Sequence, residues 1–309
     1  MAGACLAFWK PATAIWFRPQ WIPLFLGIIM LSMGLSLNFT DFKRLLEIPR
    51  SIFLGVSLQY TIMPLLGYFL AHIMDLPTDY IIGFVLVACC PSGTASNVVC
   101  FIARTHVALS VSLTTCSTLL AVLMTPLLTT LLMASISSNL LEAKVKVDTL
   151  GLLINTLKVV VFPVFFGLFL NHYFHNWVKR INSYTPLLAV LSIVFIVDYI
   201  LAVKKDSILA IGSSLLGAVV ALHSLGFLLG YILSKLFGYA EMEARTVSIE
   251  VGMQNSGLAT ELARSNFPGF ESATVPGAIS ALTHCILGSI ASGFFRIFRY
   301  KQGIKKEIL

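Results

Sequence analysis

Charged residues are scarce in this sequence. They make up 11% of the 309 residues, whereas 57% are hydrophobic, and the mean hydropathy is +0.89. A soluble domain carries about 25% charged residues. So few charges cannot cover the surface of a water-soluble protein of this size, which excludes that class. The apolar surface is therefore expected to face a lipid bilayer.

The sequence also lacks the patterns of catalytic and metal centres. There is no nucleophile with a base at a workable spacing and no HExxH zinc motif, so a membrane-embedded enzyme is the least favoured function. The net charge of +7 is spread over short loops and the C-terminus, so nucleic acid is not an expected partner, and no obligate protein partner is evident. Six cysteines without metal-ligand spacing are interpreted as small hydrophobic residues: Cys5, Cys89, Cys90, Cys100, Cys116 and Cys285.

Nine apolar stretches are long enough to cross a bilayer as helices, which takes about 20 residues each. They lie at about 20–38, 49–73, 80–103, 107–133, 147–173, 184–203, 208–236, 243–265 and 275–298. The short linkers carry most of the charge, with 13 Lys and Arg residues on one side of the predicted membrane and 7 on the other. The richer side includes the C-terminus, which is therefore predicted to be cytoplasmic.

A weak internal repeat recurs at an offset of 163 residues. Residues 65–70 read LLGYFL and residues 228–233 read LLGYIL, and the Pro-Leu pair at Pro23 recurs at Pro186. The offset pairs the first four spans with the last four. The fifth span, 147–173, would pair with a helix that lies mostly before Met1. Either this helix is largely missing or the true start lies upstream.

The repeat predicts how the second unit is oriented in the membrane relative to the first. A full unit would contain five spans, and an odd number of spans reverses the second unit in the membrane. Inverted repeats of this kind are common in secondary transporters. The sequence therefore predicts one transmembrane domain over 1–309, with repeat one at about 1–134 and repeat two at about 147–298.

Two of the spans are interrupted by glycine and polar residues at mid-membrane depth. The third contains PSGTASN at 91–97, and the eighth contains EVGMQNSG at 250–257. Unwound helix in a bilayer is tolerated only where it is buried in protein or lines a cavity. It frees carbonyl oxygens that can hold a hard cation and exposes helix N-termini that attract anions. Paired broken helices favour an ion-coupled site, and glycine kinks for close packing are the alternative.

Ionisable residues within the predicted spans include Glu250, His284 and Asp198. An ionised Glu250 at mid-membrane depth costs a few kcal/mol, so it needs a cation, a proton or a water-filled path. His284 in the last span is equally compatible with a histidine satisfied by a neighbour and with a substrate contact. Asp198 lies late in the sixth span, where an interfacial position is favoured.

At these residues the chain resembles the bile acid:sodium symporter family, especially its bacterial members. The resemblance runs from about residue 11 to residue 297. Its most specific parts are GTASN at 93–97 followed by ALSV at 108–111, IEVGMQNSGLA at 249–259, and VPGA at 275–278 with His284. Departures from the family are the missing first helix and Asp198, where a small or apolar residue is expected. If Asp198 faces the cavity, it would disfavour an anion nearby or favour one that brings its own donors.

The resemblance implies an all-α fold of inverted five-helix repeats with two crossing discontinuous helices. A panel domain, with spans at about 20–38 and 147–203, would face a core domain, with spans at about 49–133 and 208–298. Two sodium ions and a substrate would bind at the crossing. The implied ligands of the first ion are Ser96, Asn97, Ser110, Thr114 and Glu250. Those of the second are Gln59, Glu250, Gln254 and the backbone carbonyls of Val251 and Met253. The implied substrate contacts are Thr94, Asn255 and His284.

The sequence and its resemblance together predict a sodium-coupled symporter that imports a small organic anion by alternating access. Its expected location is a bacterial cytoplasmic membrane, and its substrate class is a pantoate-like hydroxy or keto acid in preference to a bile acid. The alternative is a proton-coupled organic anion transporter or exporter that uses Glu250 and His284. Replacing sodium with choline at fixed pH separates the two functions.

Overall fold

The computed structural model describes residues 2–41, 47–139, 145–211 and 213–307, and every regular element in these ranges is a helix. In chain order the elements are α1 (Ala2–Trp9), η1 (Pro11–Thr13), η2 (Pro19–Trp21), α2 (Ile22–Ser36), α4 (Pro49–Ile73), α5 (Thr78–Cys89), α6 (Ala95–Ala103), α7 (Val107–Asn139), α8 (Thr149–Thr156), the π-helical η3 (Leu157–Val161), α9 (Phe162–Tyr173), α10 (His175–Ile181), α11 (Thr185–Val203), α12 (Lys205–Ile211), α13 (Ser213–Leu236), α14 (Glu241–Gly252), α15 (Ser256–Asn266), η4 (Glu271–Thr274) and α16 (Val275–Glu307). Lys43, Arg44 and Lys144, which enter the charge comparison, lie outside the described residues.

Seven helical segments of the described ranges are long and apolar enough to cross a membrane. They are Pro19–Ser36, Pro49–Ile73, Val107–Ile136, Thr149–Tyr173, Thr185–Val203, Ser213–Leu236 and Glu271–Ile297. The other two predicted spans, at about 80–103 and 243–265, are each divided into two short helices, α5 with α6 and α14 with α15. The nine-span count therefore stays a prediction, and the two spans it adds are those that the sequence marks as interrupted.

Local sequence explains why these two helices break. Pro91 has no N–H to donate and disfavours helical geometry at the preceding residue. Cys90 is accordingly extended, with φ −74° and ψ 159°, and ends α5. In the other broken helix, Met253 is extended at φ −116° and ψ 106°. Asn255 then starts α15 as its N-cap, because its side-chain oxygen accepts from the N–H of Leu258 at 3.1 Å.

The two breaks meet each other in the interior of the protein. Ser92 and Gln254 form an isolated antiparallel bridge. Beside it, the N–H of Gly93 donates to the carbonyl of Met253 at 2.9 Å, and the N–H of Asn255 donates to the carbonyl of Pro91 at 2.8 Å. Helix α14 packs against α6 and α15 packs against α5, so the two broken helices run in opposite directions.

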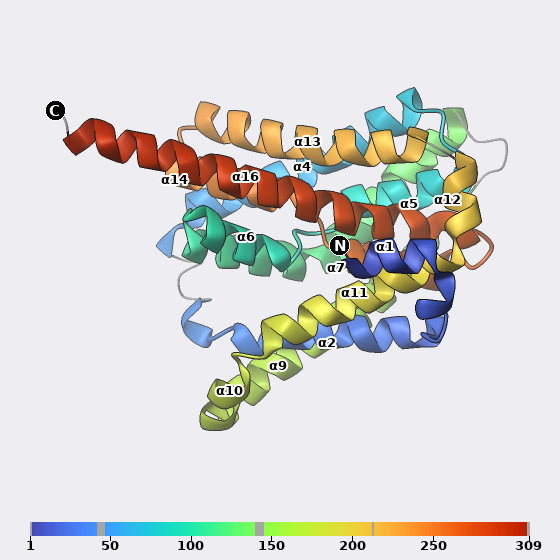
Figure 1. The fold of residues 1–309 in the computed structure, drawn as a ribbon, viewed down its shortest axis with the longest axis horizontal. Helices are drawn as coiled ribbons and strands as arrows, with labels where there is room; N and C mark the ends of the chain where they lie inside the picture. The colour runs from blue at the N-terminus through green and yellow to red at the C-terminus, as the bar shows by residue number, and fades with distance from the viewer. Residues whose placement is uncertain (1, 42–46, 140–144, 212, 308–309) are drawn as a thin grey trace.

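The remaining helices form two groups. Helix α2 packs against α9 and α11, and α11 packs against α1. The other group packs around the broken helices, with α13 against α14, α4 and α16, and α7 against α4 and α5. Figure 1 shows α2, α9 and α11 together on one side, α4 and α13 on the other, and α16 (red) running lengthwise. The crossing thus lies in the second group, beside the first.

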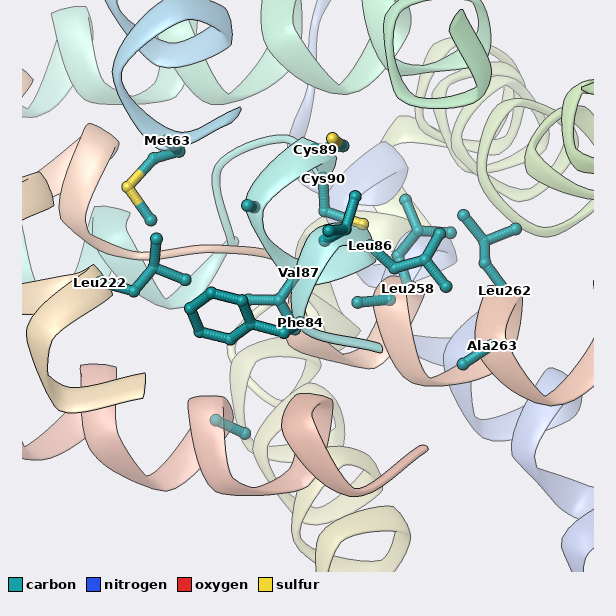
Figure 2. Close-up of a cluster of buried hydrophobic side chains, with 14 of the residues drawn as sticks. Met63, Phe84, Leu86, Val87, Cys89, Cys90, Leu222, Leu258, Leu262 and Ala263 are labelled. Carbon is teal, nitrogen blue, oxygen red and sulfur yellow. The ribbon is translucent and has the colours of Figure 1, made fainter. Parts of the chain in front are cut away.

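Fully buried apolar side chains hold α5 and α15 in place, which are one half of each broken helix. Figure 2 shows Phe84 of α5 facing Leu222 of α13, with Met63 of α4 nearby and Leu258 and Leu262 of α15 on the other side. All five side chains are fully buried. Because lipid is as apolar as these residues, close packing rather than escape from water fixes their positions. This packing keeps α5 and α15 side by side at one end of the crossing.

The helix bounds repeat at the offset found in the sequence. Both bounds of α14 lie 163 residues after the corresponding bounds of α5. Pro23 and Pro186 are the second residues of α2 and α11, where proline is well tolerated because the first N–H groups of a helix have no partner within it. Helices α5 and α14 therefore begin and end at equivalent positions, and α2 and α11 begin at equivalent positions.

Gly93→Ala is expected to destabilise the crossing. The added Cβ would lie 2.7 Å from the carbonyl oxygen of Gln254, which is backbone and cannot rotate away. Overpacking of this kind costs about 1–3 kcal/mol, so the apparent Tm of the purified protein in detergent should fall. Gly27→Ala is the control, because a Cβ there meets nothing within 4 Å. Equal Tm values for the two variants would contradict the proposed tight approach.

Candidate functional site

Glu250 lies near the end of α14, just before the break, and only 2% of it is exposed. None of the ion pairs found among the described residues includes Glu250. An ionised carboxylate without a cationic partner at this depth is costly. Its surroundings must therefore supply hydrogen bonds, a cation or a proton.

Four hydroxyl groups surround the carboxylate of Glu250. Ser92 and Thr114 donate to Oε2, each at 2.7 Å. Ser96 donates to Oε1 at 2.6 Å, and Ser110 donates to the same oxygen. Ser110 and Thr114 share one face of α7 because they are four residues apart. The structure thus brings four of the five predicted ligands of the first ion, Ser96, Ser110, Thr114 and Glu250, into direct contact.

Asn97, the fifth, joins the same cluster through its side-chain oxygen. Ser110 Oγ lies 2.7 Å from Asn97 Oδ1, and Thr114 Oγ1 lies 3.4 Å from it. A hydroxyl carries one hydrogen. Ser110 therefore cannot donate to both Asn97 and Glu250, and oxygen lone pairs outnumber the hydrogens that could satisfy them. Such a cluster, with the negative charge of Glu250, fits a hard cation.

A second polar group lies at the other face of the crossing. Gln59 Nε2 donates to the carbonyl of Cys90 at 3.2 Å and to Gln254 Oε1 at 2.9 Å, and Gln254 Nε2 donates to the carbonyl of Val251 at 2.8 Å. Gln59 Oε1 is buried and has no hydrogen-bond partner among the residues that the structure describes. A buried acceptor without a partner carries a desolvation cost that a bound cation would remove.

The structure separates Glu250 from this second group. All four hydrogen bonds of the Glu250 carboxylate go to hydroxyls of the first cluster. The link between the groups is Ser92, which donates to Glu250 and also lies 3.4 Å from the carbonyl of Met253. The sequence did not single out Ser92 as a site residue. It belongs to the PSGTASN string, but its place opposite Gln254 follows only from the crossing.

The backbone carbonyls freed by the two breaks are paired with side chains of the surrounding helices as well as with each other. Three such pairs are Thr125 Oγ1 with the carbonyl of Cys89 at 2.8 Å, Gln59 Nε2 with that of Cys90 at 3.2 Å, and His223 Nδ1 with that of Gly252 at 2.8 Å. This pairing meets the requirement that irregular backbone at membrane depth be satisfied within the protein.

A cavity of about 450 Å³ lies beside the crossing, between α2 and α11 on one side and α6, α15 and α16 on the other. Its lining is mostly apolar, and it includes all three predicted substrate contacts, Thr94, Asn255 and His284. Asn97 and Gln254 also line it, so the cavity adjoins both oxygen clusters. The side-chain oxygen of Asn255 already caps α15, which leaves its amide nitrogen as a donor.

Asp198 lines the same cavity. The sequence favours an interfacial position for this residue, and its depth in the membrane stays a prediction. Helix α1 packs against α11, and an added Cβ at Gly3 would lie 2.6 Å from Oδ2 of Asp198. The carboxylate therefore lies against α1.

Comparisons with known proteins agree with this geometry. Residues 23–211 match the model of the sodium bile acid symporter family. The probable sodium/metabolite cotransporter BASS1, chloroplastic, of Arabidopsis thaliana is 42% identical over 300 residues, which cover 97% of this chain and 73% of that protein. The sodium-dependent transporter YocS of Bacillus subtilis is 38% identical over 310 residues, which cover 99% of this chain and 92% of that protein. The probable cotransporter BASS2 of Oryza sativa is 39% identical over 95% of this chain and 68% of that protein.

These relatives are named as sodium-dependent transporters or cotransporters and not as enzymes, as the sequence predicts. With the seven apolar helices, the matches show an integral membrane protein of the sodium-dependent transporter class. The family model covers well over half of the chain, and relatives of more than 30% identity cover nearly all of it. By both measures, the chain belongs to the sodium bile acid symporter family.

Proposed function

We propose that the protein is a sodium-coupled symporter that imports a small organic anion by alternating access. The observation that carries this proposal is Glu250, a buried carboxylate held by four hydroxyls beside a cavity at the crossing of two broken helices. In a family of sodium-dependent transporters, an oxygen cluster with one negative charge is the natural place for the coupling ion.

Two sodium ions are proposed. The first binds to Ser96, Asn97, Ser110, Thr114 and Glu250, with Ser92 as an added neighbour. The second binds near Gln59, Gln254 and the carbonyls of Val251 and Met253. The unpartnered oxygen of Gln59 supports this second site. Glu250 would act on the second ion through its charge, because its hydrogen bonds go to the first cluster.

The substrate is proposed to lie in the cavity with its carboxylate towards the crossing. Helices α6 and α15 both begin there, and their first residues line the cavity. Helix N-termini carry partial positive charge and free N–H groups, which favour an anion. Two relatives are named as sodium/metabolite cotransporters. A pantoate-like hydroxy or keto acid is therefore preferred to a bile acid.

Alternating access needs two bodies that move relative to each other. We assign α1, α2, α8, α9 and α11 to the panel and the group around the crossing to the core. Helix α15 packs against α2 and α8, whereas the main partners of α6 are α7, α14 and α16. The end of the core that contains α15 is thus packed against the panel more closely than the end that contains α6. This difference supports a rocking motion about the end that contains α15.

The proposed architecture is an inverted repeat of units at about 1–134 and 147–298. The shared helix offset and the opposite directions of the two broken helices support it. We further propose a bacterial cytoplasmic membrane as the location, with the C-terminus in the cytoplasm. In the proton-coupled alternative, Glu250 and His284 would form a relay. Hydrogen bonds from His284 lead to Ser256 and Ser280 instead, which favours sodium.

Glu250→Gln is expected to abolish sodium-driven uptake of pantoate into proteoliposomes, reducing it to the level in choline medium. The change keeps the size of the side chain but removes the charge that holds the ion. Glu271→Gln, at an exposed carboxylate, is the control and should transport normally. Uptake by Glu250→Gln that still rises with a sodium gradient would refute the site. Wild-type uptake that is equal in sodium and choline at fixed pH would support proton coupling.

Gln59→Leu is expected to remove the second ion and leave the first. The leucine has a similar size but no oxygen, so the sodium dependence of uptake should change from a Hill coefficient of about two to about one. Gln20→Leu, at an exposed glutamine, serves as the control. A coefficient that stays at the wild-type value in Gln59→Leu would place the second ion elsewhere.

A further inference from the structure

A buried chain of hydrogen bonds runs from the cavity to the break of α14. Its residues come from α13, α15 and α16, and at most 5% of any of them is exposed. In order, the contacts are His284 Nδ1 with Ser256 Oγ at 3.4 Å, Ser256 Oγ with Ser280 Oγ at 2.7 Å, Ser280 Oγ with His223 Nε2 at 2.7 Å, and His223 Nδ1 with the carbonyl of Gly252 at 2.8 Å.

The carbonyl of Gly252 determines which atom is the donor in each of these hydrogen bonds. A carbonyl can only accept, so His223 Nδ1 carries a hydrogen and donates it. His223 is fully buried, and neither of its ring nitrogens contacts a carboxylate. A charge there would be unpaired, so the ring is neutral. Its Nε2 is then an acceptor and must receive the hydrogen of the Ser280 hydroxyl.

The same count of hydrogens fixes the donors in the two hydrogen bonds nearer the cavity. Ser280 has given its only hydrogen to His223, so the hydrogen between the two serines comes from Ser256. Ser256 then has none left for His284. His284 Nδ1 must therefore carry a hydrogen and donate it to Ser256. As a neutral ring, His284 is left with a lone pair on Nε2.

This lone pair is the part of His284 that remains for a solute. Nε2 has no hydrogen-bond partner among the described residues, and His284 lines the cavity. A carboxylate or keto oxygen placed there would face the lone pair and be repelled. A hydroxyl would donate to it.

We propose that His223, Ser280 and Ser256 fix His284 as an acceptor, so that the cavity selects a carboxylate solute that also carries a hydroxyl group, a hydroxy acid over the matching keto acid. This inference rests on the proposed function, because it concerns the substrate of the same site. His223 and Ser280 are positioning residues, since they act on the solute only through His284. Sites built to bind a hydroxyl discriminate strongly against analogues that lack it.

The test compares 2-hydroxyisovalerate with 2-oxoisovalerate, which differ only by a hydroxyl in place of a keto oxygen and carry no other hydroxyl. Wild-type protein in sodium should bind 2-hydroxyisovalerate about tenfold more tightly, as expected for one unpaired buried acceptor. In Ser280→Ala, the hydrogen of Ser256 is released and can be given to His284 Nδ1, which allows Nε2 to become a donor. The ratio of the two affinities should then fall to about one. Ser289→Ala, at an exposed serine of the same helix, should keep the wild-type ratio.

Equal binding of both acids to the wild-type protein would overturn this proposal and leave the symporter function intact. Absence of any sodium dependence would instead count against the proposed function. A readout that needs no ligand and no folded Ser280 variant is the ¹⁵N spectrum of histidine-labelled wild-type protein, assigned with His284→Gln. A neutral His284 protonated at Nδ1 supports the proposal, and one protonated at Nε2 overturns it.

Discussion

The structure depends on one constraint, which is that backbone groups freed by breaking a helix inside a membrane must be paired within the protein. Two helices are broken, and each break supplies part of what the other lacks, through Gly93 with Met253 and Asn255 with Pro91. Side chains of α4, α7 and α13 satisfy the neighbouring carbonyls. The crossing is therefore fastened to the helices around it, and the positions of the polar side chains in the core follow from that need.

Two residues of the broken helices connect the oxygen clusters with the cavity. Asn97 contacts Ser110 of the Glu250 cluster, Gln254 contacts Gln59, and both line the cavity. A solute and a cation would therefore bind to two faces of the same short segments. Ordering of these segments by one ligand lowers the entropy that the other must lose, so each would increase the affinity for the other by the same factor.

The sequence predicts the membrane helices, both breaks and much of the candidate site. Pro91 and the glycine-rich strings mark the interruptions, whereas Ser110 and Thr114 are named as partners of Glu250 only through the resemblance to the family. It does not predict contacts that exist only because of the crossing, such as Ser92 with Glu250. His223 is also missed, although an intramembrane histidine is itself a signal. Its span reads as an ordinary apolar helix, and its partners belong to segments far along the chain.

The mutual pairing of the two breaks has a consequence for biosynthesis. Pro91 leaves the ribosome before its partner Asn255 has been made, and more than half of the chain lies between them. During that interval the carbonyl of Pro91 and the N–H of Gly93 lack their partners, and they cannot be exposed to hydrocarbon without a large cost. The insertion machinery must therefore keep α5 and α6 in a hydrated or protein-lined space until the second broken helix arrives. Completion of α14 and α15 is then the step that commits the first half of the protein to the lipid phase.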